Sequence, residues 1–235
     1  MLASFALEKD YHLVLKDKLA KIKKYILSMI DAQIEYFVDN GPVDEKLAAY
    51  LSGLGYYGKN TLIINKDFGS YILIGELLVD FEIVSSIPVT NNCANCDLCD
   101  QHCPTDATKA VYDKCLAGFL QRKISLSDEI YNQFTKIYGC DVCISICPKN
   151  SRVKTKENYL YENVDLLDII KSTRHEFTRY NEYAFYWLGH NLMKRNAIII
   201  AANNGIDITK ELDYVNSTED YMLSAIKYYK KKMNI

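Results

Sequence analysis

Eight cysteines are the residues of this chain best suited to do chemistry, and all of them lie between residues 93 and 147. The first run holds four cysteines separated by two, two and three residues and closed by a proline: Cys93, Cys96, Cys99, Cys103 and Pro104. This is the spacing of the cysteines that ligate 4Fe-4S clusters in bacterial ferredoxins. A second run has the same form with one cysteine missing, and one further thiol lies between the runs: Cys140, Cys143, Cys147 and Pro148, with Cys115 between. The pattern predicts two iron–sulfur clusters.

Crossed ligation divides the eight thiols into two complete sets. In ferredoxins with two clusters, the last cysteine of each run ligates the cluster of the other run. The first cluster would then be held by Cys93, Cys96, Cys99 and Cys147. The second would be held by Cys103, Cys115, Cys140 and Cys143. No thiol is left over, which supports this division.

Two other uses of eight cysteines compete with this prediction. Disulfides are typical of small secreted chains, but 235 residues can bury a core without them, and no secretory signal precedes the cysteines. Zinc is the stronger alternative, because two four-cysteine sites also use eight thiolates. Zinc ribbons, however, usually separate their cysteine pairs by longer spacers, whereas a continuous run closed by proline favours a 4Fe-4S cluster.

The pattern of apolar residues around the cysteines predicts an α+β protein with three domains. Residues 1–88 mix helix and strand, 89–152 form a ferredoxin-like domain for both clusters, and 153–235 are helical. In the first segment, apolar residues recur at helical spacing over 9–30, and a second helix is expected over 43–51, closed by glycine. Two β-prone runs, 61–65 and 70–74, are expected to pair as a hairpin or as adjacent strands.

Further helices are expected around and after the second cysteine run. Two of them, 112–123 and 127–137, would carry Cys115 and return the chain to Cys140. The last segment lacks internal proline over four helix-like stretches, which are 165–172, 182–193, 194–203 and 218–231. Antiparallel helices with short connections resemble a HEAT-like solenoid pair.

The composition is that of an ordinary soluble globular protein. Hydrophobic residues make up 49% of the chain and charged residues 25%, which excludes a disordered chain. The net charge of −2 creates no overall field to attract nucleic acid or an anionic membrane. The apolar runs are too short to span a bilayer or to act as a signal peptide. We therefore expect a cytoplasmic protein without a membrane partner, in a compartment that keeps thiols reduced.

A glycine-rich loop, 53–60, invites a nucleotide-binding interpretation that its context disfavours. Its sequence comes close to a P-loop, but Asn60 stands where a Ser or Thr is required, and Gly53, Gly55 and Gly58 also match the dinucleotide string. Both motifs need a strand before the loop and a helix after it, and here the predicted order is reversed. The loop could approach a large flat or anionic ligand closely, or could simply end a helix and turn.

Several stretches together resemble the epoxyqueuosine reductase family. They are Asp10-Tyr11-His12, residues 38–43, residues 53–65, Phe68-Gly69-Ser70, Gly75-Glu76-Leu77-Leu78, both cysteine runs at the family's spacing, and Lys194-Arg195-Asn196-Ala197. The resemblance extends over most of the chain, from about residue 10 to residue 203. It is far more specific than the cysteines alone.

The resemblance implies a cobalamin-dependent oxidoreductase of queuosine biosynthesis. Members of the family hold a cobalamin beside two 4Fe-4S clusters and remove the epoxide oxygen of epoxyqueuosine in the anticodon loop of tRNA. Residues 1–88 would then be a corrinoid-type cofactor domain. The implied partners are tRNA and an external electron donor of the flavodoxin or ferredoxin type.

The same resemblance assigns roles to five residues of the first segment. Asp39 corresponds to the family's proton donor, and a carboxyl beside a large apolar macrocycle would have a raised pKa. Lys59, Asn60, Ile63 and Ile74 correspond to positions near the corrin. From the residues alone, Asp39 would be a turn former, and Ile63 and Ile74 would be core residues. His12 is expected to be a helix-face residue, because the family binds cobalamin without a histidine on the cobalt.

The chain also departs from the family pattern, which leaves other hypotheses open. Family members carry about one further domain before the position of Asp10, so we expect a short, divergent member whose corrin pocket is incomplete. The residues after Cys115 differ from the aromatic and hydroxyl-bearing segment that the family has near its cofactor and tRNA. The C-terminal helices are also shorter than the family's tRNA-binding solenoid. The alternatives are a non-catalytic ferredoxin-like electron-transfer module and an activator that reduces the corrinoid of another protein.

Overall fold

A computed structural model of the 235-residue chain describes every residue except 109–111, 155–158 and 161–163. The chain divides into two compact units, and each is discontinuous in sequence. Unit 1 comprises Met1–Asp10, Cys103–Asp141 and Lys156–Ile235, and unit 2 comprises Tyr11–His102 and Val142–Thr155. Helices and strands are both present, as predicted. The three predicted domains, 1–88, 89–152 and 153–235, have other bounds than these units and stay a prediction.

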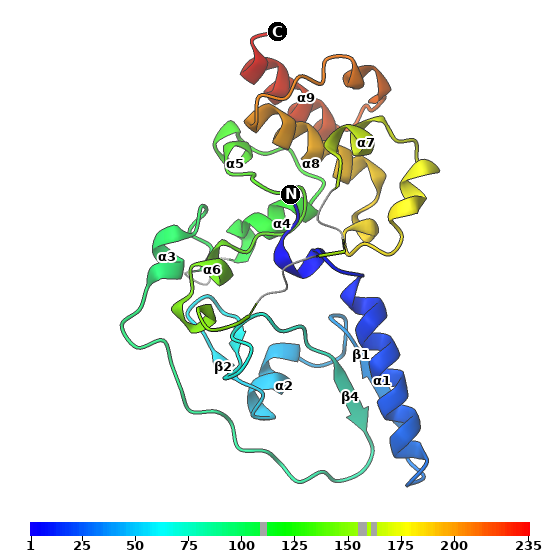
Figure 1. Cartoon of the computed structure of the whole chain (residues 1–235), viewed down its shortest axis with the longest axis vertical. Coiled ribbons are helices and arrows are strands. Elements are labelled where there is room, and N and C mark those ends of the chain that lie inside the picture. The colour runs from blue at the N-terminus through cyan, green and yellow to red at the C-terminus, as the bar shows by residue number, and fades with distance from the viewer. Residues whose placement is uncertain (109–111, 155–158, 161–163) are drawn as a thin grey trace. The chain divides into compact units, whose positions relative to one another are not determined.

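Unit 2 begins with a long helix beside a small antiparallel sheet (Figure 1). Helix α1 (Tyr11–Leu27) packs against strands β1 (Ile34–Phe37) and β4 (Glu76–Val79), which pair antiparallel. Leu19 is the buried residue of the helix, and a Cβ on Gly75 would lie 2.9 Å from its side chain. Glycine at position 75 therefore lets the helix approach the sheet closely. The predicted helix over 9–30 is confirmed with shorter bounds.

The glycine-rich loop of unit 2 connects a short helix to a two-stranded ladder. Helix α2 (Glu45–Leu51) starts at Asp44, whose carboxylate accepts a hydrogen bond from Leu47 N at 3.0 Å. Strands β2 (Tyr56–Tyr57) and β3 (Ile63–Ile64) then pair antiparallel. The helix expected over 43–51 is thus confirmed.

The predicted pairing of 61–65 with 70–74 is wrong. The first of these runs contains β3, which pairs backward with β2, and 70–74 forms no strand. The side chain of Asn65 accepts hydrogen bonds from Asp67 N and Phe68 N, which curls the connection into a tight turn. Beyond the turn, Ser70 N donates to the side chain of Asn150 instead of to a neighbouring strand.

The cysteine runs of unit 2 lie on short helical pieces. These are α3 (Leu98–His102), α6 (Val142–Ser145) and a 3-10 turn η3 (Pro148–Asn150), and α3 packs against α6. Asn150 is buried and joins this segment to the Asn65 turn. Its amide nitrogen donates to Ser70 Oγ at 2.8 Å and to Ile144 O at 2.7 Å.

Unit 1 has a helical core. Helix α8 (His190–Asn203) contacts α9 (Asp220–Met233), α7 (Leu166–Lys171) and α4 (Leu116–Gln121), and its residues from Leu192 to Ala202 are all buried. Figure 1 shows α8 and α9 side by side. The remaining pieces are short: α5 (Asp128–Asn132), η1 (Ser4–Ala6), η2 (Tyr112–Lys114), η4 (Glu176–Tyr180), η5 (Tyr186–Leu188) and η6 (Glu211–Tyr214).

The predicted helices of unit 1 are confirmed in part. Those expected over 165–172 and 218–231 correspond to α7 and α9, and those expected over 112–123 and 127–137 are shortened to α4 and α5. The division into 182–193 and 194–203 is wrong, because one helix, α8, runs through residues 193 and 194. It starts after Gly189, whose φ of 78° ends the preceding 3-10 turn. Within the described residues, no helix is long and apolar enough to cross a membrane.

Candidate functional site

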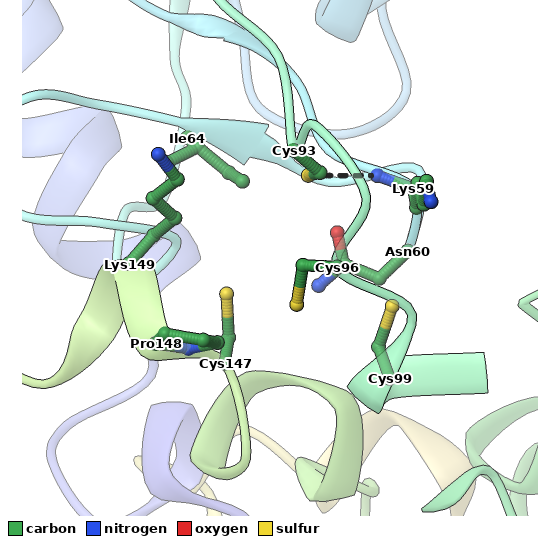
Figure 2. A pocket seen from close by; sticks show the side chains of 9 residues that line it. All are labelled: Lys59, Asn60, Ile64, Cys93, Cys96, Cys99, Cys147, Pro148 and Lys149. Atoms are coloured by element: carbon green, nitrogen blue, oxygen red, sulfur yellow. Dashed lines mark hydrogen bonds between the residues drawn. The ribbon is translucent and has the colours of Figure 1, made fainter. Parts of the chain in front are cut away.

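Four of the eight cysteines line one cavity in unit 2. Cys93, Cys96, Cys99 and Cys147 turn their sulfur atoms toward the same space (Figure 2). Cys93 and Cys96 lie on the loop before α3, Cys99 lies on α3, and Cys147 immediately precedes η3. The structure therefore brings Cys147 to the same cavity as the first run, and the ligation of one cluster by these four thiols stays a prediction. None of the eight cysteines forms a disulfide.

Backbone hydrogen bonds shape the loop that carries these thiols. Ala94 has a φ of 48°, and its N–H donates to the side chain of Asn92 at 2.7 Å. Cys96 N donates to Cys93 O at 3.1 Å, which closes a turn between the two cysteines. From the glycine-rich loop, Lys59 N donates to Cys93 Sγ at 3.4 Å (Figure 2). Hydrogen bonds to ligand sulfur are among the main influences on the potential of an iron–sulfur cluster.

The four-thiol cavity can be compared with the needs of a zinc ion and of a 4Fe-4S cluster. Four thiolates on one zinc ion lie about 3.8 Å apart, because each Zn–S bond is about 2.3 Å long. Among the described residues, which include all eight cysteines, no group of three or more His, Cys, Asp or Glu side chains is arranged to hold a metal ion. Thiolates of a 4Fe-4S cluster bind four different irons and need no such close approach. The four thiols around one cavity match the ligand number of a 4Fe-4S cluster, and the choice between a cluster and zinc stays a prediction.

The remaining four cysteines are divided between the units. Cys103, Cys115 and Cys140 belong to unit 1, and Cys143 belongs to unit 2. Burial alone would raise the pKa of Cys103, but hydrogen bonds from backbone N–H groups, including that of Ala107 at 3.2 Å, lower this pKa overall. Cys115 directly precedes α4, and its side chain makes no capping hydrogen bond. The assignment of these four thiols to one cluster stays a prediction.

Asp39 lies at the centre of a second polar cluster in unit 2. It follows β1 with a φ of 65°, and its N–H donates to Glu45 Oε2 at 3.1 Å. Its carboxylate oxygen Oδ2 accepts a hydrogen bond from the Tyr11 hydroxyl and lies 2.8 Å from His12 Nε2. The side chain of Asp39 is 38% exposed and that of His12 is 21% exposed. The Asp39 carboxyl is therefore held by two neighbouring side chains and is still partly open to solvent.

Tyr11 and His12 are the residues of this cluster that sequence reasoning missed. Both lie in the first turn of α1, where their rings stack with centroids 4.2 Å apart. The prediction of His12 as a plain helix-face residue is therefore incomplete. The Asp10-Tyr11-His12 string in the sequence was the available signal for these residues. Only the fold of unit 2, however, brings Tyr11 and His12 to Asp39.

Carboxylates near Asp39 make the cluster acidic. Burial raises the pKa of Glu45, and the negative charge of Asp39 acts in the same direction. Burial and the charge of Asp44 likewise raise the pKa of Glu76. A Cβ on Gly41 would lie 2.7 Å from Glu76 Oε2, so glycine at position 41 leaves room for this carboxylate beside the turn.

The residues predicted to contact a corrin do not all lie together. Lys59 and Asn60 line the cysteine cavity, which is also lined by Ile64, Pro148 and Lys149. Ile63 and Ile74 are not among its lining residues, and Ile63 is buried in β3. The Asn60 side chain donates to Cys143 O at 3.3 Å and accepts a hydrogen bond from Leu62 N. These contacts support the loop from within.

The glycines of the 53–60 loop have structural reasons that need no bound nucleotide. Gly53 ends α2 with a φ of 74°. A Cβ on Gly55 would lie 2.5 Å from Ile64 O, and one on Gly58 would lie 2.6 Å from Asn60 Oδ1. The loop is therefore packed too closely against β3 and its own turn for larger residues.

Comparison with known proteins gives a consistent result at the level of whole sequences, although no protein-family model matches the chain. It is 30% identical over 241 residues to the epoxyqueuosine reductase of Lactococcus garvieae, an alignment that includes 96% of this chain and 69% of the relative. It is 29% identical over 234 residues to the epoxyqueuosine reductase of Staphylococcus aureus, including 94% of this chain and 62% of the relative.

Solved structures of the same enzyme share the fold. The structure of epoxyqueuosine reductase from Streptococcus thermophilus superimposes with a TM-score of 0.86 at 29% identity, covering 97% of this chain and 65% of that one. An epoxyqueuosine reductase with an epoxyqueuosine-modified tRNA-Tyr stem loop gives a TM-score of 0.81 at 22% identity, covering 100% of this chain and 75% of that one. The chain thus spans about two thirds of these proteins, and it belongs to the epoxyqueuosine reductase family.

Proposed function

We propose that this chain is an oxidoreductase that removes the epoxide oxygen of epoxyqueuosine in tRNA, a step of queuosine biosynthesis. The observation that carries the proposal is the presence, within unit 2, of a four-thiol cavity and of Asp39 held by Tyr11 and His12. Conversion of an epoxide to an alkene consumes two electrons and two protons and releases the oxygen as water. A cluster bound in the thiol cavity would deliver the electrons, and the Asp39 cluster would deliver the protons.

Asp39 is the proposed proton donor to the departing epoxide oxygen. Such an oxygen needs a proton in the transition state, and a positioned carboxyl contributes about 10² to 10⁴-fold to the rate. Tyr11 and His12 both contact Oδ2, which fixes the orientation of the carboxyl group. In the proposal, His12 returns a proton to Asp39 after each transfer.

Electrons reach the site one at a time from an external donor of the flavodoxin or ferredoxin type. We assign Cys93, Cys96, Cys99 and Cys147 to one 4Fe-4S cluster, and Cys103, Cys115, Cys140 and Cys143 to the other. Lys59 N supports the first cluster through its hydrogen bond to Cys93 Sγ. The tRNA partner is proposed from family membership, since a relative's structure holds an epoxyqueuosine-modified tRNA stem loop.

The proposed second cofactor is cobalamin, which supplies a strongly nucleophilic cobalt when bound. The residues present fit a corrin less completely than they fit a cluster. The Asn60 and Ile63 side chains are only 6% and 3% exposed, because they are packed in the interior of unit 2. We therefore route no step through the corrin and assign to this chain the proton donor and the electron path. Of the four positions expected near the corrin, Lys59 is exposed and Ile74 half-buried, so these two are the proposed contacts, whereas Asn60 and Ile63 would act only by supporting the loop.

Turnover by an Asp39→Asn variant tests the proposal. The full chain is purified without oxygen, reconstituted with iron, sulfide and cobalamin, reduced, and given a tRNA stem loop that carries epoxyqueuosine. We expect the wild type to convert the nucleoside, as followed by mass spectrometry, and Asp39→Asn to be slower by at least about 100-fold. Iron content and the EPR signals of the reduced clusters should be unchanged in the variant.

The control is Asp31→Asn, which changes an exposed carboxylate in the same unit and should convert the nucleoside at the wild-type rate. A wild type with reducible clusters but no turnover would support the electron-transfer module in place of the reductase. Equal turnover by wild type and Asp39→Asn would remove Asp39 from the mechanism while leaving the activity intact.

A further inference from the structure

One buried hydroxyl beside the cysteine cavity has no role in the mechanism above. Tyr56 lies on β2 with its side chain directed inward and is only 4% exposed. Its hydroxyl oxygen is inaccessible to solvent, and no described residue accepts a hydrogen bond from it, since the nearby Lys149 ammonium can only donate. Buried hydroxyls nearly always find a partner, because leaving one unpaired costs its full desolvation penalty. A missing partner at this position therefore points to a group that binds there.

The surroundings of Tyr56 identify where that group would lie. Its strand partner Ile64 lines the cysteine cavity (Figure 2). Burial raises the pKa of Tyr56, the nearby Lys149 ammonium lowers it, and the thiols of Cys93 and Cys147 act to raise it. The hydroxyl thus lies within electrostatic reach of two of the four thiols and of a lysine that also lines the cavity.

Donor and acceptor chemistry then leaves one use for the hydroxyl hydrogen. An ammonium group has only donors, so Lys149 can satisfy the lone pairs of the Tyr56 oxygen but cannot accept its hydrogen. Asn60 Oδ1 on the cavity side already accepts a hydrogen bond from Leu62 N, and the other side-chain acceptors there are sulfur atoms, namely the thiolates of Cys93 and Cys147 and the sulfides of a bound cluster. A tyrosine hydroxyl can donate to such a sulfur across the cavity edge.

We propose that the Tyr56 hydroxyl donates a hydrogen bond to the cluster held by Cys93, Cys96, Cys99 and Cys147 and raises the reduction potential of that cluster. This inference rests on the cluster assignment of the proposed function. Reduction adds one electron, supplied by the external donor, and makes the cluster and its thiolates more negative, with no bond formed or broken in Tyr56. A hydrogen bond to sulfur stabilises the more negative state, so the reduced form is favoured.

The test is a redox titration of the reconstituted full chain, followed by EPR, in the wild type and in Tyr56→Phe. Phenylalanine keeps the ring in the core and removes only the hydroxyl. We expect the midpoint potential of one of the two clusters to become more negative, with iron content and circular dichroism unchanged. The control is Tyr57→Phe, because Tyr57 is the next residue of β2, points to the opposite face and is 40% exposed. It should leave both potentials unchanged.

A second measurement detects the hydrogen bond itself. Electron–nuclear double resonance of the reduced wild type should show an exchangeable proton near one cluster that disappears after exchange into D2O and is absent in Tyr56→Phe. Full iron content with an unshifted potential and an unchanged proton signal would overturn the inference for Tyr56 alone. A wild type that takes up zinc and forms no cluster would overturn both this inference and the cluster assignment.

Discussion

The helical core of unit 1 and the cysteine loops of unit 2 are stabilised in different ways. In unit 1, α8 buries every residue from Leu192 to Ala202 against its neighbouring helices. In unit 2, α3 and α6 bury no residue fully, and their loops depend on hydrogen bonds from single side chains such as Asn150. Apolar burial holds a fold without help, whereas loops of this kind need further bonds to stay in place.

The two regions also differ in how they treat buried charge. Arg195 on α8 is fully buried, and its Nη2 donates to the carbonyl oxygens of Phe119, Leu120 and Arg122 around the end of α4. Burial lowers the pKa of Arg195 to about 10, which still leaves it charged at neutral pH. Charge in unit 1 therefore anchors one helix to another. In unit 2, four thiols line a cavity and the Asp39 carboxylate is 38% exposed, so these charged groups do not anchor one helix to another.

Removal of iron should produce the largest difference between the two regions, measured as the rate of amide hydrogen exchange. Chelation under reducing conditions is expected to speed amide exchange by at least about 100-fold in 93–102 and 142–150, because metal bonds supply the folding energy of such loops. Exchange in α8 should change by less than about threefold, because its protection comes from apolar burial. Hydrogen exchange with mass spectrometry measures both segments in one sample. Equal loss of protection in α8 and in the cysteine loops would show that the regions are not distinct.

Truncation of the buried arginine should affect unit 1 nearly as much. Arg195→Ala leaves the carbonyls at the end of α4 without their donor and creates a cavity, so we expect a loss of about 3–5 kcal/mol in the free energy of unfolding. Urea denaturation monitored by circular dichroism measures it. The matched control is Arg179→Ala, since Arg179 is 46% exposed and pairs with Asp168 at 2.7 Å on the surface. That variant should lose less than about 1 kcal/mol, and similar losses in the two variants would contradict the buried anchor.

Truncation of Asn150 tests the polar support of unit 2. Asn150→Ala removes the bonds to Ser70 and Ile144, and we expect a loss of about 2–3 kcal/mol in the iron-free protein. The loss should be smaller once clusters are bound, because they hold the same segment in place. Asn203→Ala is the counterpart in unit 1, where the amide donates to Tyr131 O and Phe134 O, and its effect should not depend on iron. If the loss of stability caused by Asn150→Ala were as independent of iron as that caused by Asn203→Ala, the proposed difference between the two units would be contradicted.

Acidification should give the smallest effect, confined to unit 1. Burial, followed by the charge of Lys194, lowers the pKa of His190, whose Nε2 donates to Ser172 O at 2.6 Å. The unfolded chain then binds the proton more readily than the folded one, starting near the unfolded pKa of about 6.5. Stability should be complete above that pH and fall as the pH drops toward the lowered folded pKa. His190→Gln should reduce this slope in urea titrations at pH 7 and pH 5, and an unchanged slope would exclude His190 as its source.

Local patterns predicted the parts of the fold that depend on neighbouring residues. Helical periodicity indicated α1, a stretch closed by glycine indicated α2, and stretches without internal proline indicated α7 and α9. Local patterns failed at α8, where burial on all sides obscures the period and a single glycine sets the start. They failed again at 70–74, where Ser70 hydrogen bonds to Asn150, eighty positions later in the sequence, instead of joining a ladder.

By itself, the sequence determined the donor set and the family. Eight cysteines in two proline-closed runs predict what kind of metal group the chain holds, because ligand type and spacing are properties of short segments. The tertiary structure alone decided three things: that Cys147 shares a cavity with the first run, that Tyr11 and His12 contact Asp39, and that the Tyr56 hydroxyl is buried without an acceptor for its hydrogen among the described residues. Each depends on residues brought together by the path of the chain, and no local pattern encodes that path.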